Sequence, residues 1–479
     1  MSQNFLSMPL ADVVVDAGAV EGPLELWRHS VGLTAVNHLP LPDRVVAGLH
    51  RLEPRLIRVF IQEFFHVYPE HGRFDWTLLD PYMAALERTG AKVVAAIAIK
   101  PPPLFPTVDQ AIWQPNDVDE WRRVIAALVS RYSVDRRIVT YWEIGNEPDA
   151  GEAGGCPYLM PDPAAYIQYY QMTSEAVLDA FPGAKVGGPA TCWVDNEPLP
   201  GLVAYCRESG TQLDFISWHR YSDNPRVHAL GIEKAKALLA GYPGTRPELL
   251  VTEWNKSFEF VPDISANDAS AAMTGRTVSV EDMAFAPRRA AIAAASILAM
   301  AKAGPDWTFY FAGWDMAFYP EEWRSFFSAA GSANMQQHWN EVPHRFGLFG
   351  VSGEVRPQYF VYQLLSRLGP EQISATCGNP DLHLLAARGE QHVAVVLANL
   401  NPSTSHECLA ALTFRHLTPG PKVLTVYRID EQRRWTQDPP ALRPVEQRPL
   451  YAPETLRYQV YAPADSVILV SLQEEGTGA

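Results

Sequence analysis

The sequence predicts an α/β fold, a (β/α)8 (TIM) barrel with an additional C-terminal β-sandwich domain. Its 479 residues suffice for one barrel-sized domain and a smaller one, because single cores rarely grow beyond about 300 residues. Eight short apolar runs alternate with helical segments along most of the chain, as in successive β and α units. After about Leu368, strand-like runs broken by proline and glycine follow one another. We therefore expect the barrel at residues 17–368 and the β-sandwich at 369–479.

The eight apolar runs are the expected barrel strands. They are followed by amphipathic helical segments such as 121–132 and 166–180, and Asp162 is the expected N-cap of the second, just before Pro163. An apolar helical segment at 290–301 is far shorter than the roughly 20 residues of a membrane span, so we expect a core helix and no membrane partner. The expected strands are 31–36, 56–60, 92–99, 139–146, 185–190, 215–221, 249–255 and 308–314.

Two other stretches bear on the architecture. The first strand-like run of the chain, residues 12–16, precedes the first barrel strand, and we expect the N-terminal segment 1–16 to join the β domain. The segment 261–284 is polar, rich in small residues and long for a loop, and it follows the seventh expected strand. Because barrel enzymes build their sites from loops at that end of the strands, we expect this segment to shape a binding site.

Composition and charge exclude several classes of function. The formal net charge of -15 repels nucleic-acid phosphates, so no nucleic-acid partner is expected. The five cysteines are widely spaced and form no C-x-x-C pair, which favours reduced thiols over a disulfide framework or a zinc site. No P-loop, dinucleotide fingerprint or metal-ligand spacing is present, so we expect neither cofactor nor metal. The amino terminus lacks the pattern of a secretory signal, and we expect a cytoplasmic protein; the sequence does not predict its oligomeric state.

Two expected strands end in carboxylates. The fourth ends in Asn146-Glu147-Pro148, and the seventh ends in Thr-Glu253-Trp-Asn. Strand ends form the active site of such a barrel, and the fourth and seventh strands lie on different sides of its mouth. Hydrolysis of a glycosidic bond needs one carboxylic acid and one carboxylate flanking the bond, with a hydrogen bond to the sugar 2-hydroxyl, which Asn146 is placed to make. Each motif alone is equally typical of an ordinary turn or strand end, but together they favour catalysis.

The chain resembles glycoside hydrolase family 39, the retaining β-xylosidase and α-L-iduronidase family of clan A. The resemblance covers nearly the whole sequence and is carried by an ordered series of segments in addition to the two glutamate motifs. These segments are 55–60, 67–68, 79–103, 186–190, 214–219, 346–349 and 427–430. It implies a glycosidase that acts on an oligosaccharide or glycoside and needs no cofactor.

The resemblance also implies roles for individual residues. Glu147 would be the general acid/base, Glu253 the nucleophile and Asn146 the partner of the sugar 2-hydroxyl. Arg58, near the end of the second strand, would lie beside the nucleophile and keep it ionised by charge pairing. The alternative for Arg58 is an interior ion pair with Glu143, and the sequence does not separate the two.

Further candidates lie at other strand ends. His219 and Tyr221 are two residues apart and so point to the same face of the sixth strand, where they would orient the glutamates. Trp314 is expected as a platform under the sugar, with Asp315 beside it as a hydroxyl acceptor. For a single His or Trp, an ordinary place in the core is the simpler interpretation, and only the matching strands favour function. Residues expected to widen the substrate site are Gln62, Trp113 and Trp193.

The chain departs from the xylosidase pattern at three places. The sequence Arg58-Val59-Phe60 stands where these enzymes read Arg-Phe-His, so the sugar-binding His is replaced. Gly145 replaces the Trp that usually precedes Asn-Glu-Pro, and no acidic Phe-Glu-Glu segment follows the eighth strand. Because these positions contact hydroxyls and not the scissile oxygen, the expected reaction stays the same while the sugar is left open.

The predicted function is that of a retaining, β-xylosidase-like glycoside hydrolase that works by double displacement through a covalent glycosyl-enzyme intermediate. Two alternatives remain. One is a carbohydrate-binding protein without turnover, and the other is a transglycosylase, which shares the chemistry but passes the sugar to an acceptor other than water.

Overall fold

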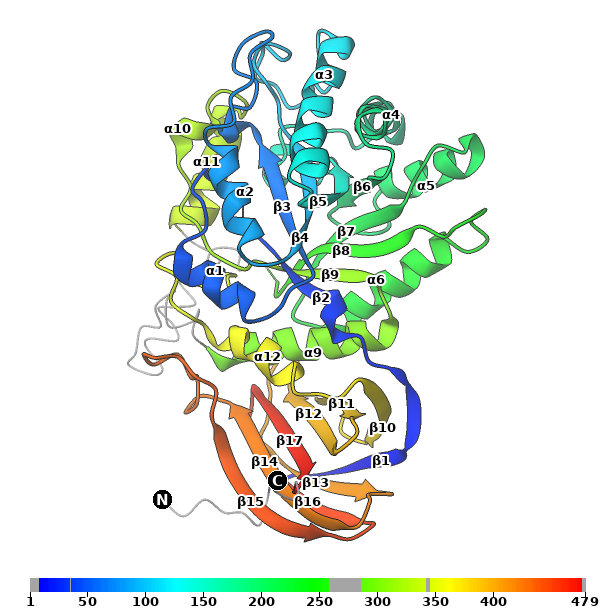
Figure 1. The fold of residues 1–479 in the computed structure, drawn as a ribbon, viewed down its shortest axis with the longest axis vertical. Coiled ribbons are helices and arrows are strands. Elements are labelled where there is room, and N and C mark those ends of the chain that lie inside the picture. Colours follow the sequence, from blue (N-terminus) through cyan, green and yellow to red (C-terminus); the bar gives the residue numbers. More distant parts are fainter. Residues whose placement is uncertain (1–7, 35, 258–285, 342–344, 476–479) are drawn as a thin grey trace.

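The protein consists of a barrel and a sheet domain, which confirms the predicted fold class (Figure 1). The computed structural model describes residues 8–34, 36–257, 286–341 and 345–475. Eight parallel strands close into the barrel, and a nine-stranded sheet lies below it in the view of Figure 1. The segment 261–284 lies outside the described residues, so its expected part in the site stays a prediction.

The barrel strands follow one another around the barrel in chain order, and all eight predicted runs form them. The first and the eighth strand end earlier than predicted, at Gly32 and Phe311, because these two residues form the last pair of the ladder that joins the two strands. Beyond it, the N–H of Phe349 donates to the carbonyl of Gly313, so this part of the chain pairs outside the barrel. The strands are β2 His29–Gly32, β3 Leu56–Gln62, β4 Lys92–Ala98, β5 Val139–Ile144, β6 Lys185–Thr191, β7 Phe215–Tyr221, β8 Glu248–Asn255 and β9 Trp307–Phe311.

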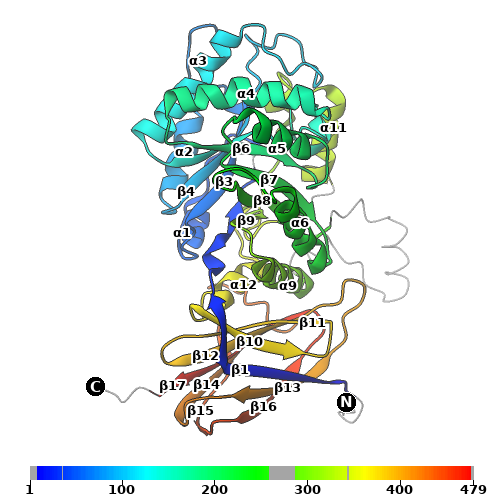
Figure 2. The ribbon, with the colours of Figure 1, turned by 90° about the vertical axis from the view of Figure 1, so that its right-hand side faces the viewer.

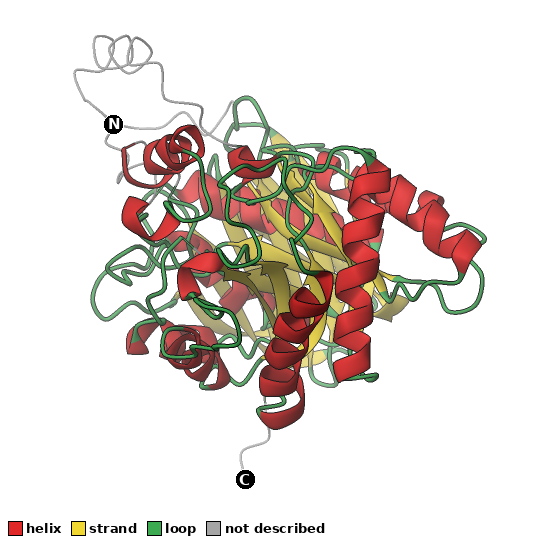
Figure 3. Cartoon of the chain, turned by 90° about the horizontal axis from the view of Figure 1, so that it is seen from above, coloured by secondary structure: helices red, strands yellow, loops and turns green. Residues whose placement is uncertain are grey.

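Helices surround the barrel strands when the molecule is seen from above (Figure 3). The helix expected at 166–180 begins at Pro163, and the carboxylate of its N-cap Asp162 accepts a hydrogen bond from the N–H of Ala164 at 3.0 Å, as its sequence predicts. The helices are α1 Asp43–His50, α2 Leu79–Glu87, α3 Val118–Val129, α4 Pro163–Ala180, α5 Pro198–Ser209, α6 Pro225–Leu238, α9 Pro287–Ala303, α10 Pro320–Trp323, α11 Ala329–Gln336 and α12 Pro357–Leu365.

The second domain is all-β, as predicted. Its strands form one mixed sheet in the order β15-β14-β17-β12-β11-β10-β1-β13-β16, and the sheet encloses a core of small and branched apolar side chains. The first strand of the chain pairs antiparallel with β10 and parallel with β13. The limits 17–368 and 369–479 stay predictions. The strands are β1 Leu10–Pro23, β10 Glu371–Cys377, β11 Leu382–Arg388, β12 His392–Asn399, β13 Cys408–Arg415, β14 Gly420–Ile429, β15 Pro444–Ala452, β16 Leu456–Ala462 and β17 Ser466–Glu474.

Helices α9 and α12 lie between the barrel and the sheet domain (Figure 2). The α9 segment expected to be a core helix is buried along most of its length. At its start, Nη1 of Arg288 forms an ion pair of 2.9 Å with Asp465 of the sheet domain. No helix in the described part of the chain has the length and apolar character of a membrane span.

Candidate active site

Glu147 follows β5 in a turn that glycine and backbone hydrogen bonds make possible. Gly145 has φ 92°, a conformation that favours glycine, and Glu147 itself has φ 39°, which a residue with a side chain rarely adopts. The turn is held because the N–H of Glu147 donates to the carbonyl of Ala190 on β6 at 2.9 Å, and the carbonyl of Glu147 accepts from Gly151 at 2.9 Å. Backbone strain of this kind persists where the surroundings determine the position of a functional side chain.

Glu253 reaches the site from β8, which pairs with β7 in the barrel. A register shift after Trp218 pairs His219 of β7 with Glu253 of β8. As predicted from their spacing, His219 and Tyr221 point to one face, and each contacts a glutamate. The hydroxyl of Tyr221 donates to Oε2 of Glu253 at 2.6 Å.

Arg58 binds three acceptors at the bottom of the site. Its Nη1 donates to Oε1 of Glu253 at 2.6 Å, its Nε donates to Oε2 of Glu143 at 2.7 Å, and its Nη2 donates to Oδ1 of Asn146 at 2.7 Å. Arg58 and Glu143 are both fully buried. The two interpretations of Arg58 that the sequence left open therefore hold together, since one guanidinium pairs with both carboxylates.

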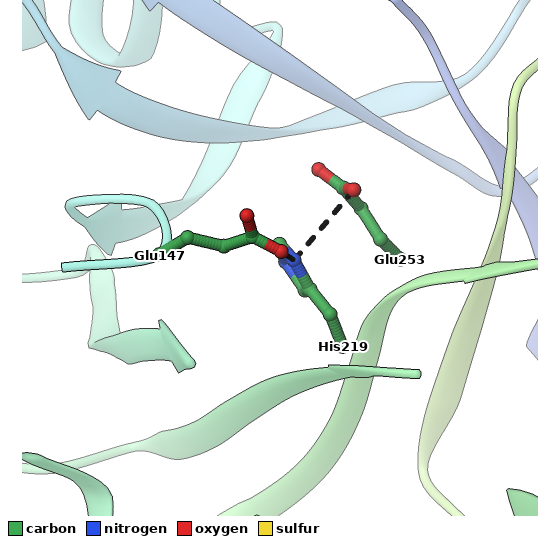
Figure 4. Close-up of side chains that lie close together, drawn as sticks. All are labelled: Glu147, His219 and Glu253. Atoms are coloured by element: carbon green, nitrogen blue, oxygen red, sulfur yellow. Dashed lines mark hydrogen bonds and ion pairs between the residues drawn. The ribbon is translucent and has the colours of Figure 1, made fainter. Parts of the chain in front are cut away.

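The two glutamates face each other with His219 between them (Figure 4). Nδ1 of His219 shares a hydrogen bond of 2.7 Å with Oε1 of Glu147 and lies 3.6 Å from Oε2 of Glu253. One carboxylate oxygen of each glutamate and a ring nitrogen of His219 all lie within 4.8 Å of one another.

Their surroundings make the two carboxyls unequal. Burial, followed by the charges of Glu253 and Asp149, raises the pKa of Glu147 well above its usual range. Burial also raises the pKa of Glu253, but there the charge of Arg58 and the hydrogen bonds from Tyr221 and Arg58 oppose the rise. Glu147 is therefore the group that holds a proton, and Glu253 is the one held as a carboxylate.

Neighbouring groups keep fixed protonation states. Burial and the nearby charge of Arg58 lower the pKa of His219 well below its usual range, so its ring is neutral. Burial and the charges of the two glutamates raise the pKa of the Tyr221 phenol well above its usual range, so it stays a donor. Neither group competes with the glutamates for a proton near neutral pH.

A cavity of about 510 Å³ opens over the two glutamates. Volumes of this size hold small ligands. Aromatic rings form a cluster on the Glu253 side: Phe311 lies 6.3 Å from Tyr221 and from Phe346 and 6.1 Å from Trp339, centroid to centroid. The Glu147 side is lined by small side chains and a thiol, namely Ala150, Ala153, Gly154, Gly155 and Cys192.

The structure brings most of the expected site residues together. Gln62 lines the cavity, and its Nε2 donates to the carbonyl of Gly155 at 2.9 Å. Asn146 is 2% exposed, and its Nδ2 lies 3.3 Å from the carbonyl of Gly154, its acceptor. Neither Trp113 nor Trp193 belongs to the cavity lining among the described residues.

Trp314 and Asp315 lie away from the cavity lining formed by the described residues, contrary to expectation. Because β9 ends at Phe311, the next residues leave the barrel: Nε1 of Trp314 donates to the carbonyl of Val351 at 3.3 Å. Asp315 is buried in an ion pair of 2.6 Å with Arg356. The aromatic side chain that β9 places at the cavity is that of Phe311, three residues before Trp314.

Several residues that line the cavity could not be predicted from the sequence. Met335 and Trp339 come from α11 and the short helix that follows it, in a segment without a strand-like or amphipathic pattern. Arg220 was passed over because alternation along β7 places it on the face opposite His219 and Tyr221. The sequence feature that could have identified Arg220 is its position directly between two predicted site residues.

Glu147, His219 and Glu253 lie close enough to one another to hold a metal ion. The carboxylate of Glu253 already accepts hydrogen bonds from Arg58 and Tyr221. The expected absence of a metal stays a prediction.

A pair of unequal carboxyls under a cavity at the carboxyl ends of barrel strands defines a class of protein, the glycoside hydrolases on (β/α)8 barrels. The comparison with family models identifies the family. The model of glycosyl hydrolases family 39 matches residues 73–435, more than half of the chain, and the protein belongs to this family. This confirms the family resemblance seen in the sequence.

The curated relatives of this chain include beta-xylosidases and an alpha-L-iduronidase. Beta-xylosidases from Geobacillus stearothermophilus and Caldicellulosiruptor saccharolyticus are 25% identical over 187 residues and 24% identical over 315 residues. The matches cover 34% and 60% of this chain and 36% and 55% of the relatives, so the chain spans about a third to a half of their length. Human alpha-L-iduronidase is 30% identical over 137 residues, 26% of this chain and 20% of the relative.

Solved structures share the whole fold. A monomeric beta-xylosidase from Caulobacter crescentus CB15 superposes with a TM-score of 0.70 at 20% identity, covering 98% of this chain and 100% of the other. A GH39 enzyme from Xanthomonas axonopodis pv. citri gives a TM-score of 0.71 at 18% identity, covering 99% and 100%. At this identity the likeness shows the fold.

Proposed function

We propose that this protein is a glycosidase of the retaining type, with Glu253 as the nucleophile and Glu147 as the general acid/base. The observation that carries the proposal is the spacing of the two carboxyls, with oxygens within 4.8 Å of each other. Retaining enzymes hold their carboxyls about 5 to 5.5 Å apart, whereas inverting enzymes need about 6.5 to 9.5 Å to admit a water. The unequal surroundings support the assignment of the roles.

The first step forms a covalent intermediate. Ionised Glu253 attacks the anomeric carbon through one carboxylate oxygen, while protonated Glu147 donates its proton to the glycosidic oxygen and the bond to the leaving group breaks. Arg58 and Tyr221 bind the carboxylate of Glu253 and orient it. The leaving group departs with the proton of Glu147, which is now a carboxylate.

The second step returns the enzyme to its first state. Glu147 removes a proton from water, the water oxygen attacks the anomeric carbon, and the ester bond to Glu253 breaks. Once Glu253 is bound as an ester, its negative charge is gone. One cause of the raised pKa of Glu147 is then absent, so this pKa falls. The lower pKa favours the ionised form, which Glu147 needs in order to act as a base. The sugar leaves with its anomeric configuration retained.

A mechanism-based fluoro-sugar tests the proposal. A 2-deoxy-2-fluoro glycoside with a good leaving group is expected to form a stable ester on Glu253, which peptide mass spectrometry locates. Proton NMR of the first product formed from an aryl glycoside is expected to show the anomer of the substrate. Labelling of another residue, or the opposite anomer, would contradict the assignment.

The same experiments separate the alternatives. A carbohydrate-binding protein without turnover would form no adduct, and the presence of both glutamates at bonding distance from their partners argues against it. A transglycosylase would form the adduct but release little free sugar when an acceptor sugar is present. Because the named relatives include beta-xylosidases and alpha-L-iduronidases, β-D-xylosides and α-L-iduronides lead the panel of aryl glycosides to be screened.

A further inference from the structure

Arg220 is a cation on the cavity wall without a charged partner. It lies on β7 between His219 and Tyr221 and lines the same cavity as the two glutamates. Among the described residues its side chain makes no ion pair or hydrogen bond, and its Nε is buried without an acceptor. Burying part of a guanidinium without a hydrogen-bond acceptor costs free energy. A bound ligand that supplies the acceptor would remove this cost.

The ring of Trp193 holds this guanidinium in place. Cζ of Arg220 lies 4.6 Å from the centroid of the Trp193 ring. The ring is itself fixed, because its Nε1 donates to Oδ2 of Asp195 at 3.1 Å and its edge lies against α6, where a Cβ at Gly231 would be 3.1 Å from it. A guanidinium stacked on an aromatic face keeps the N–H groups along its edge available for a planar anion.

Among the described residues, the guanidinium of Arg220 forms no ion pair with a carboxylate. Glu143 and Glu253 share Arg58, and Glu147 holds a proton. The nearby carboxylate of Asp195 is paired with Lys234. An anionic group that enters the cavity can therefore bind Arg220 without displacing an existing ion pair.

Arg220 lies on the side of the cavity where the leaving group departs. Cys192 lies next to Trp193 in the chain and lines the cavity together with Glu147, the proton donor to the leaving group, whose charge is a cause, after burial, of the raised pKa of the Cys192 thiol. The sugar itself is expected at Glu253, where Tyr221 and the aromatic cluster lie.

We propose that Arg220, stacked on Trp193, binds an oxyanion on the leaving group of the substrate, so that the enzyme acts on glycosides with an anionic aglycone. The anion is a carboxylate or a sulfate, both of which match the fork of a guanidinium. The inference rests on the proposed function for the direction of the leaving group. Arg220 acts as a specificity-determining residue and takes no part in the bond-breaking steps.

Binding of non-hydrolysable analogues tests the inference without turnover. The probes are 1-thio-β-D-xylosides of 4-carboxyphenyl, 4-sulfophenyl and neutral 4-(methoxycarbonyl)phenyl groups, titrated by calorimetry. At low salt, the wild type is expected to bind at least one anionic probe about 10-fold or more tightly than the neutral one, as for a charge-assisted hydrogen bond. Whichever anion is preferred identifies the oxyanion. Equal affinity for all three probes, or no binding, would overturn the inference.

Substitutions assign the effect to the residue. Arg220→Gln is expected to abolish the preference while leaving affinity for the neutral probe within about 2-fold, and Arg220→Lys is expected to retain part of it, because lysine keeps the charge but not the fork. Arg207→Gln, which removes one positive charge from α5, is the control for net charge and is expected to keep the full preference. An equal preference in Arg220→Gln and in the wild type would contradict the role of Arg220.

Turnover separates this inference from the proposed function. The O-linked 4-(methoxycarbonyl)phenyl glycoside reports hydrolysis alone, and the ratio of kcat/KM for the carboxylate and its methyl ester reports the anion. If the ester is hydrolysed with retention but the ratio is the same in wild type and Arg220→Gln, the inference fails and the proposed function stands. If neither is hydrolysed while the thioglycosides show the preference, the proposed function fails and the anion site stands.

Discussion

The two sides of the cavity treat a carboxyl group in opposite ways. Glu253 accepts hydrogen bonds of 2.6 Å from the guanidinium of Arg58 and from the phenol of Tyr221. Glu147 is largely buried beside the neutral imidazole of His219 and a thiol, and the nearby charges of Glu253 and Asp149 are negative. The difference shows how one fold keeps two identical side chains in different protonation states. The charged and phenolic donors stabilise the carboxylate of Glu253, and the lack of such donors around Glu147 favours its protonated form.

Removing each glutamate gives the largest expected contrast. Glu253→Ala lacks the nucleophile, and kcat on a 2,4-dinitrophenyl glycoside is expected to fall by about 10⁴-fold or more. Glu147→Ala keeps the first step with this leaving group, which needs no proton, and is slowed in the second step. With added azide, the two variants are expected to give glycosyl azides of opposite anomeric configuration, inverted for Glu253→Ala and retained for Glu147→Ala. The same anomer from both would reverse or abolish the assigned difference.

Arg58 is expected to be the main support of the Glu253 side. Arg58→Met leaves the carboxylates of Glu143 and Glu253 buried without a cation, which is expected to lower the unfolding free energy by about 3–5 kcal/mol. Arg220→Met is the matched control, because Arg220 has no ion pair to lose among the described residues, and its effect is expected to stay below about 1 kcal/mol. Urea denaturation followed by tryptophan fluorescence measures both. Equal losses would mean that the ion pairs of Arg58 do not stabilise the barrel.

The sequence predicted those parts of the site that depend on regular strands. Glu253, His219 and Tyr221 lie at strand ends whose apolar runs and spacing are intact, so period-2 alternation places them correctly. Trp314 was misplaced because the apolar run continues past Phe311, where the ladder to β2 ends. Nothing local in the sequence marks that end, since it depends on pairing with a distant strand.

Contacts between distant loops could not be predicted at all. Trp339 reaches the cavity because α11 lies over the loop after Glu147, where the carboxylate of Glu152 accepts a hydrogen bond of 2.8 Å from the N–H of Ser328. Arg220 belongs to a strand whose alternation points it outward, and its long side chain lines the cavity nonetheless. Such positions follow from tertiary packing, which a single sequence does not encode in any short pattern.

Tyr221 is expected to make a smaller contribution than Arg58 on the same side. Tyr221→Phe removes the hydroxyl that donates to Glu253 at 2.6 Å but keeps the ring. Loss of a hydrogen bond to a charged group is expected to lower kcat/KM by about 10- to 100-fold. Because the lost donor favoured the ionised form, the pKa of Glu253 is expected to rise, and the acid limb of the pH profile moves to higher pH. Tyr310→Phe, whose hydroxyl donates to a backbone carbonyl, is the control and should leave that limb unchanged.

Asp149 gives the smallest expected effect and tests the Glu147 side. Its negative charge is one cause of the raised pKa of Glu147, after burial and Glu253, so Asp149→Asn is expected to lower that pKa. Because Glu147 must be protonated to act as the acid, the alkaline limb of kcat/KM is expected to move to lower pH. The control is Asp195→Asn, which removes a carboxylate paired with Lys234 and is expected to leave the alkaline limb in place.

The same shift has a consequence for stability that checks its sign. A carboxyl whose pKa is raised on folding contributes stability that is fully present below its unfolded pKa and is lost as the pH rises through its folded pKa. In both proteins the loss begins at the unfolded pKa of Glu147 and ends at its folded pKa. Removing the charge of Asp149 lowers the folded pKa, so the loss ends at lower pH and is smaller in Asp149→Asn. Unfolding free energies measured across the pH range of the alkaline limb are therefore expected to level off at lower pH in the variant than in the wild type. An alkaline limb that stays in place in Asp149→Asn, or that moves to higher pH, would show that Asp149 does not help to keep Glu147 protonated.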